Sequence, residues 1–168
     1  TATVGARYVV LTNSMLSGAA LLDIARERLT NLAAVTNRSS MYEHLVLDRH
    51  ERHLLVLTER GTWVVPTDDP THATKVGGKG GWSDLSPDGT TVAVSSGREL
   101  STVGVDGSGR KTVLPNGRVT PVYVGDQLMG RSADGFVTID DGRFKVLVKG
   151  DLTSVVVLGR DRSVALVA

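Results

Sequence analysis

Short apolar runs separated by turn residues recur along the whole chain. Several of them alternate apolar and polar positions, which is typical of strands that bury one face. The runs are Arg7–Leu11, His53–Thr58, Thr62–Val65, Thr91–Ser95, Phe136–Ile139, Phe144–Val148 and Ser163–Val167. Asp-Gly and Asn-Gly pairs begin at Asp88, Asp106, Asn116, Asp134 and Asp141. Such pairs favour the positive φ angles of hairpin turns. The pattern predicts an all-β chain of short strands joined by tight turns.

The strand pattern repeats about every 40 residues. In one register an aspartate precedes a new apolar strand, at Asp48, Asp88, Asp126 and Asp161. A second register marks the end of a later strand, at Leu22-Asp23, Val65-Pro66, Val105-Asp106 and Ile139-Asp140. A period of about 40 residues with about four short strands per unit is typical of β-propeller blades. Helical solenoids can have similar periods, but they need helical patterning, which Gly-rich alternating strands do not provide.

The predicted fold class is therefore an all-β propeller of short, four-stranded antiparallel blades, with about four repeats. We treat residues 1–168 as a single domain or as a fragment of a larger ring. The approximate blades are 1–38, 39–77, 78–117 and 118–150, with a partial blade at 151–168.

The segment Ser17–Val35 fits two predictions. Its apolar residues recur at helical spacing, and Ser17 could serve as an N-cap. The repeat register instead favours two outer strands, Ala19–Ala25 and Leu29–Val35, with a turn at Arg26-Glu27-Arg28. We prefer the strands because tertiary context overrides local propensity.

One unit resembles a known family. The segment from Trp82 to Ser96, continued by Val103–Gly109, is similar to a TolB-like (WD-repeat-like) propeller blade. Its Ser86-Pro87-Asp88-Gly89, followed by an apolar strand, is that family's most recognisable element. Pro87 presets φ for a turn, and Asp88-Gly89 completes it. The likeness extends over Trp82–Leu114 and is weak in the other units. It implies short four-stranded blades but no single activity, because such blades serve as docking platforms, ligand-binding funnels and gates on serine peptidases.

The composition limits the classes of partner and site to be expected. Lys plus Arg number 19 and Asp plus Glu 18, giving a net charge of +1, whereas nucleic-acid binding calls for a patterned basic surplus. No run approaches the roughly 20 apolar residues of a membrane span. The absence of cysteine excludes disulfides and cysteine metal sites. No signal-peptide pattern opens the chain at Thr1–Gly5, and the TolB resemblance favours an extracytoplasmic location.

The local sequence motifs for metal binding, nucleophilic catalysis or phosphate binding are weak. His50 and His53 form a His-x-x-His pair around Glu51, but the segment reads as a charged turn between strands, so we expect no metal there. His72 reads as a solvated loop residue. No Gly-x-Ser-x-Gly elbow is present. The run Gly77–Gly81 lacks the order of a phosphate loop and reads as a connection between blades.

Two further groups of residues are interpreted as structural rather than functional. The acid pairs Asp68-Asp69 and Asp140-Asp141 fall at turn positions and are read as turn formers. Trp63 and Trp82 lie in strand patterns and are read as packing residues. We therefore predict no local catalytic residue, no metal and no cofactor.

The predicted function is a non-catalytic propeller that acts as a protein-interaction scaffold. Its partner would be a protein or a complementary propeller segment. The alternative is a ligand-binding or enzyme-associated propeller, a lyase or hydrolase among them, whose site lies in the central channel. Channel-facing candidates from the innermost strands are Tyr42, His44, Ser83, Asp84, Thr120 and Tyr123. His44 also reads as a core or edge histidine.

The pattern predicts that each end of the chain is the second strand of a blade, at Ala6–Thr12 and at Arg162–Ala168. Gly5 and Asp161 then hold equivalent positions in the repeat. One possibility is a four-bladed ring in which Leu152–Leu158 becomes the first strand of the blade that begins at Ala6. The other, which we favour, is a larger ring whose open edges are covered by further β-structure.

Overall fold

A computed structural model of the chain describes residues 2–13, 18–36, 41–140, 142–150, 154–158 and 163–167. It contains four antiparallel four-stranded sheets, each with its strands in chain order, and one strand pair. Sheet A comprises β1 (Ala2–Val4), β2 (Tyr8–Thr12), β3 (Ala19–Asp23) and β4 (Arg28–Asn31). Sheet B comprises β5 (Tyr42–Leu47), β6 (His53–Thr58), β7 (Gly61–Pro66) and β8 (Thr74–Gly77). Sheet C comprises β9 (Trp82–Leu85), β10 (Thr91–Ser95), β11 (Leu100–Gly104) and β12 (Lys111–Leu114). Sheet D comprises β13 (Thr120–Val124), β14 (Gln127–Ser132), β15 (Gly135–Asp140) and β16 (Arg143–Lys149). The strands β17 (Ser154–Leu158) and β18 (Ser163–Val167) pair with each other.

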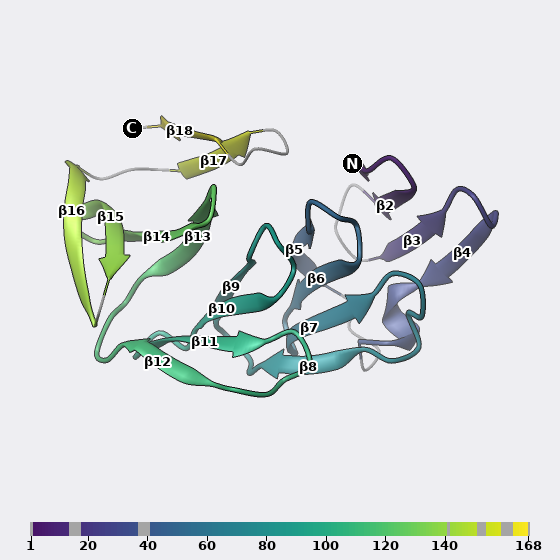
Figure 1. Cartoon of the computed structure of the whole chain (residues 1–168), viewed down its shortest axis with the longest axis horizontal. Helices are drawn as coiled ribbons and strands as arrows, with labels where there is room; N and C mark the ends of the chain where they lie inside the picture. The colour runs from purple at the N-terminus through teal and green to yellow at the C-terminus, as the bar shows by residue number, and fades with distance from the viewer. Residues whose placement is uncertain are drawn as a thin grey trace.

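The four sheets stand side by side in an arc, with sheets A and D at its two ends (Figure 1). The first strands contact one another in succession, β1 with β5, β5 with β9 and β9 with β13. The fourth strands lie on the outside of the arc (Figure 1). This is the arrangement of propeller blades around an axis, so the predicted fold class is confirmed.

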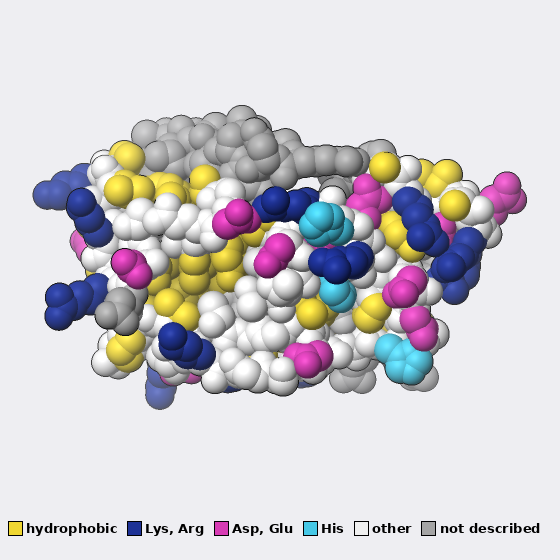
Figure 2. All heavy atoms as spheres, in the orientation of Figure 1, with side chains coloured by type: hydrophobic (Ala, Val, Ile, Leu, Met, Phe, Trp, Pro, Cys, Tyr) yellow, Lys and Arg dark blue, Asp and Glu magenta, His cyan; other side chains and the backbone are white. Residues whose placement is uncertain are grey.

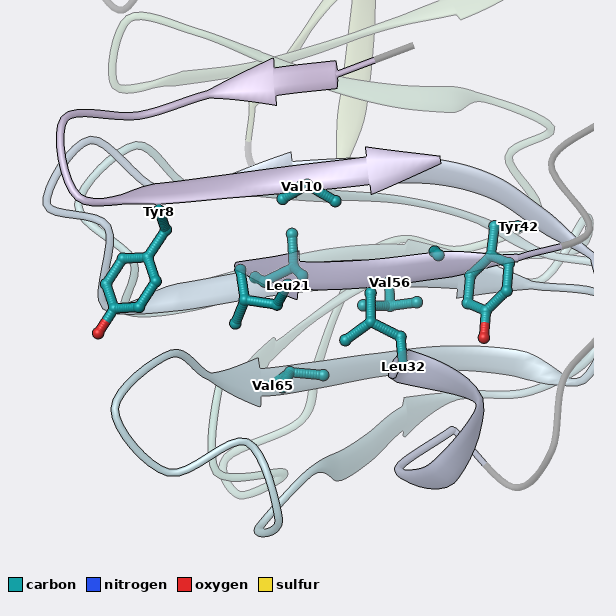
Figure 3. Close-up of a cluster of buried hydrophobic side chains, with 9 residues drawn as sticks. Tyr8, Val10, Leu21, Leu32, Tyr42, Val56 and Val65 are labelled. Carbon is teal, nitrogen blue, oxygen red and sulfur yellow. The ribbon is translucent and has the colours of Figure 1, made fainter. Parts of the chain in front are cut away.

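Apolar side chains fill the spaces between neighbouring sheets. Between sheets A and B they form a cluster in which Leu21, Leu32 and Val56 lie close together, with Tyr8 and Tyr42 at its two ends (Figure 3). A second cluster lies between sheets B and C, and a third between sheets C and D. Burying one Val or Leu side chain is worth about 1.5–3 kcal/mol, so these clusters hold the blades together.

The two middle sheets bury both of their faces, and this explains their sequences. In β6, Leu54 and Val56 face sheet A, whereas Leu55 faces sheet C. All three are fully buried. A strand covered on both sides reads as a continuous apolar run rather than an alternating one.

The segment Ser17–Val35 forms strands, as the repeat register predicted, but their bounds differ; Ser17 itself lies outside the described residues. The first strand ends at Asp23, and the second runs from Arg28 to Asn31. A single 3-10 turn follows at Leu32–Ala34, capped by the Asn31 side chain, which accepts a hydrogen bond from the Ala33 N–H. The turn places Leu32 in the cluster between sheets A and B. The residues at helical spacing thus do not share one face, since Leu21 and Leu32 belong to the cluster whereas Leu22 pairs with Leu29 on the other face of the sheet. The predicted extension of the second strand to Val35 was wrong.

The prediction that the chain begins with a second strand was also wrong. β1 precedes β2, pairs with it through Val4 and Val9, and completes sheet A. β17, which was considered as the missing first strand of this blade, pairs with β18 instead. The four-bladed closure therefore does not occur in this structure. Asp161, the proposed equivalent of Gly5, lies outside the described residues.

Candidate functional site

The six candidate channel residues all lie on the innermost strands β5, β9 and β13. Four of them, Tyr42, Ser83, Asp84 and Tyr123, are buried at 6% exposure or less. Tyr42 belongs to the cluster between sheets A and B, where burial raises the pKa of its hydroxyl above the usual value.

Ser83, Asp84 and Tyr123 form hydrogen bonds between blades. The Ser83 and Thr62 hydroxyls are 2.8 Å apart and join sheet C to sheet B. On the other side, the Tyr123 N–H donates to Asp84 Oδ2 at 2.7 Å. These polar groups therefore stabilise the blade interfaces, and whether any of them also binds a ligand stays a prediction.

Tyr123 also uses its hydroxyl, which lies 3.2 Å from Thr91 Oγ1 in sheet C. The second Asp84 oxygen accepts the Leu85 N–H at 2.9 Å. A buried carboxylate is tolerated only when it is hydrogen-bonded, and Asp84 meets that condition with backbone donors of two blades.

The remaining candidates, His44 and Thr120, occupy equivalent places together with Trp82. Each pairs with the fifth residue of the second strand of its blade, namely Leu57, Arg131 and Ser95. We call His44, Trp82 and Thr120 the inner-strand rim. His44 is exposed, Thr120 is half-buried and the Trp82 side chain is 49% exposed.

The two tryptophans differ in environment. Trp63 is buried at 4% exposure, and the Lys75 ammonium lies over its ring at 5.1 Å from the centroid. Trp63 is thus a packing residue, as predicted. Trp82 is half-exposed at the rim, so its interpretation as a packing residue was wrong.

The hairpin turns between first and second strands meet on one face of the arc, and the β5–β6 turn lies at their centre. Its Arg49 N–H donates to the Pro87 carbonyl at 3.0 Å, and Arg52 Nη2 donates to the Asp88 carbonyl at 2.8 Å. Arg49 Nη2 also lies 2.6 Å from Asp126 Oδ1 in the β13–β14 turn. On the face shown in Figure 2, side chains of both signs are interspersed, without a field of a single charge.

Glu51 joins the same turn to sheet A. Its carboxylate accepts hydrogen bonds from the backbone N–H groups of Ala6 and Arg7 (2.8 Å) in the β1–β2 turn and of Tyr8 (3.2 Å) at the start of β2. Successive N–H groups that point to one spot form an anion-binding concavity. Gly5 leaves room for this contact, because a Cβ at that position would displace the Glu51 carboxylate.

The structure corrects the aspartate register. The β5–β6 and β9–β10 turns are built alike: the Asp48 N–H donates to the His53 carbonyl, and the Ser86 N–H donates to the Thr91 carbonyl. The Asp48 carboxylate and the Ser86 hydroxyl also accept the N–H of the same residues, His53 and Thr91. Asp48 is therefore equivalent to Ser86, not to Asp88.

The corrected register pairs Glu51 with Gly89, and both have positive φ, 55° and 71°. Sequence analysis placed Glu51 in a surface turn and missed its contact with sheet A. The equivalence to the glycine of Asp-Gly would have signalled an unusual backbone, but it becomes visible only in the correct register. Asp126 lies in the shorter β13–β14 turn, next to Gly125 at φ 52°. No residue of that turn is equivalent to Asp48.

Asp48 organises the β5–β6 turn. Burial opposes ionisation, but the nearby His53 imidazole and hydrogen bonds from the Arg52, His50 and His53 N–H groups outweigh it and lower the pKa of Asp48. His50 is exposed, and His53 is the half-buried first residue of β6 with Nδ1 3.2 Å from Asp48 Oδ2. The segment between Asp48 and His53 thus forms a turn, as predicted, with His50 inside it and His53 at its end. Within the described part of the chain, no three His, Asp or Glu side chains are grouped so as to hold a metal ion.

The other motifs lie in connections. Residues 78–81 connect β8 to β9, that is, sheet B to sheet C. In the β7–β8 loop, Nδ1 of the exposed His72 lies 2.7 Å from Asp69 Oδ2. Asp141 lies outside the described residues. In the described ranges no helix is long and apolar enough to span a membrane.

Comparisons with known proteins agree on the fold. No family model matches the chain, and no curated protein matches it. Among solved structures, TolB from Acinetobacter baumannii matches with a TM-score of 0.61 at 16% identity, over 95% of this chain and 45% of that chain. An extracellular domain from Bacteroides thetaiotaomicron matches with a TM-score of 0.63 at 13% identity, over 98% of this chain and 25% of that one. The Cps50 (Swd1) β-propeller domain of Myceliophteria thermophila matches with a TM-score of 0.58 at 13% identity, over 87% and 56%.

These matches place the chain among β-propeller folds, and the resemblance to TolB is confirmed at the level of structure. The chain spans between a quarter and just over half of the length of the three matched chains. At these identities the likeness shows the fold and leaves the function open.

Proposed function

We propose that this chain is a non-catalytic section of a β-propeller and acts as an interaction scaffold for a protein partner. The observation that carries the proposal is the exposure of Trp82 at the inner-strand rim. A large aromatic side chain that folding leaves half-exposed gains most from burial against a partner, and Trp is enriched in binding hot spots. Met41, 54% exposed just before β5, adds apolar surface at the same end of the first strands.

The state of the inner-strand polar groups supports a non-catalytic role. Ser83, Asp84 and Tyr123 use their polar atoms in hydrogen bonds between blades. A group committed to holding two blades together is poorly suited to proton transfer with a bound substrate, because its movement would disturb the interface.

The proposal divides the chain into blades at 1–38, 39–77, 78–117 and 118–150, followed by a partial blade at 151–168. The four four-stranded sheets and the β17–β18 pair support this division. We also propose an extracytoplasmic location, which is supported by the extracellular domain among the structural matches.

A ligand-binding propeller is the second candidate. Exposed His44 and half-buried Thr120 belong to the rim and favour it, because they are the two candidate channel residues whose side chains remain accessible. Such a ligand would be small and polar, and it would contact His44 directly.

The test compares the wild-type chain with Trp82→Ala and with Phe144→Ala as a matched control. Phe144 is 41% exposed on the outer strand β16, so the control removes a similar aromatic area away from the rim. Each immobilised protein is exposed to an extract of its host, and bound proteins are quantified. A partner that is lost with Trp82→Ala and retained with Phe144→Ala supports the scaffold. Equal capture by all three proteins contradicts it.

The same three proteins test the second candidate, the ligand-binding function. Their melting temperatures are measured with a panel of small polar metabolites, and His44→Ala is added. A ligand that raises the melting temperature of the wild type, but not of His44→Ala, favours the ligand-binding function. No shift with any metabolite removes its support.

A further inference from the structure

Sheet A stands at one end of the arc, so no blade covers its face that points away from sheet B (Figure 1). The residues of β2 and β3 on that face are apolar. Their side chains alternate with those of Tyr8, Val10 and Leu21, which are 1–2% exposed against sheet B. We define the outer face of sheet A as Val9, Leu11, Ala20, Leu22 and Leu29. In this set Leu29 is 61% and Leu11 39% exposed, and the other three are half-buried.

The same positions are buried in the following blades. Val9 pairs with Leu22 across β2 and β3. The equivalent pair in sheet B is Leu54 with Val65, both at 0% exposure.

In sheet C the equivalent pair is Val92 with Val103, at 0% and 2% exposure. In each case the pair packs on the sheet that precedes it in the chain. The outer face of sheet A therefore repeats an interface that the molecule already forms inside the arc.

We infer that the outer face of sheet A binds a further propeller blade, an antiparallel sheet with Val- and Leu-rich side chains. Continuity with the existing interfaces identifies the occupant, because the face offers the same residue types at the same register. An extended peptide would need unpaired backbone groups at a sheet edge, whereas this face offers side chains. No charged side chain belongs to the face, so complementarity of charge plays no part.

The isolated 168-residue chain allows a direct test, since the blades available to this face are then those of a second copy. Sedimentation velocity over a wide concentration range should show association of the wild type. Leu22→Lys should weaken the apparent association constant at least tenfold, because the ammonium would have to be desolvated in the interface. Phe144→Lys, which places the same charge on sheet D, is the control and should associate more like the wild type.

A monomeric wild type at every concentration would overturn the inference, as would equal association of Leu22→Lys and the wild type. Thermal unfolding of Leu22→Lys should stay cooperative, because Leu22 lies outside the three clusters. Val103→Lys, at the equivalent buried position in sheet C, should lose cooperative unfolding.

A second measurement keeps the inference testable if Leu22→Lys does not fold. The chain has no cysteine, so Leu29→Cys introduces a single thiol on the outer face. Its alkylation rate should fall as the protein concentration rises, because association covers the face. A rate that is independent of concentration, in a sample that associates, would show that another surface is responsible.

Discussion

Removal of the Glu51 carboxylate should separate the β1–β2 turn from the β5–β6 turn. The carboxylate accepts three backbone N–H groups of sheet A. A hydrogen bond to a charged group is worth about 1.5–3 kcal/mol when buried, and the partial exposure of Glu51 reduces this. We expect Glu51→Ala to lower the free energy of unfolding by about 2–3 kcal/mol, roughly the value of one buried charged bond. Glu51→Gln, which keeps a neutral acceptor, should lose about 1 kcal/mol.

Glu27 provides a matched control. It is also a glutamate with positive φ, 49° against 55° for Glu51, and it is exposed in the β3–β4 turn. Glu27→Ala keeps the backbone conformation and should stay within about 0.5 kcal/mol of the wild type. Comparison of the two alanine variants therefore isolates the carboxylate contacts from the cost of the left-handed backbone.

Urea unfolding followed by tryptophan fluorescence measures the effect. With an m-value of about 2 kcal/mol/M, Glu51→Ala should shift the midpoint by about 1–1.5 M and leave m unchanged. If Glu51→Ala is no less stable than Glu27→Ala, the carboxylate does not hold the two turns together, and the reasoning is refuted.

Three further predictions concern other parts of the molecule. The pKa of Asp48 is lowered in the folded state, so its ionisation stabilises the fold above the unfolded pKa of about 3.9 and ceases to do so as the pH falls towards the folded pKa. Urea titrations should show that the difference in free energy of unfolding between the wild type and Asp48→Asn is widest above about pH 5 and closes below about pH 4. A difference that is independent of pH would contradict the assignment. Gly89→Ala should destabilise by about 2–4 kcal/mol, because φ is +71° and the new Cβ would overlap the Asp48 carboxylate; Gly97→Ala, at φ +77° in open space, should lose only about 1 kcal/mol in the same assay, and equal losses would refute the overlap. Trp82→Phe should leave emission from buried Trp63 alone, blue-shifted and weakly quenched by acrylamide, whereas unchanged quenching would show that Trp82 is not the exposed tryptophan.

Prediction from the sequence succeeded where a local pattern and the repeat agreed. Each blade carries its own apolar strands and turn residues, and a period of about 40 residues ties them together. The segment Ala19–Asn31 shows why the repeat was needed. Its spacing mimics a helix, and only the place of the segment in the blade favours strands.

Contacts with a partner in another blade were not predicted. Asp84 was chosen as a channel residue, and nothing in the sequence indicated that its carboxylate accepts the Tyr123 N–H 39 residues away. Glu51 bonds the β1–β2 turn across 43 to 45 residues. No local spacing reports such contacts, because they depend on how neighbouring blades are positioned.

The arc of four blades is the central claim, and nuclear Overhauser effects between protons of the folded chain test it most directly. The structure predicts cross-strand contacts within the four sheets and side-chain contacts from A to B, B to C and C to D. The Tyr123 amide proton should give a contact to the Asp84 side chain, and Leu22 should give none to sheet D of the same chain. Contacts between Leu22 and sheet D within one chain, in a sample dilute enough to be monomeric, would show a closed four-bladed ring, and sequential amide contacts of a helix along residues 18–34 would contradict the fold itself.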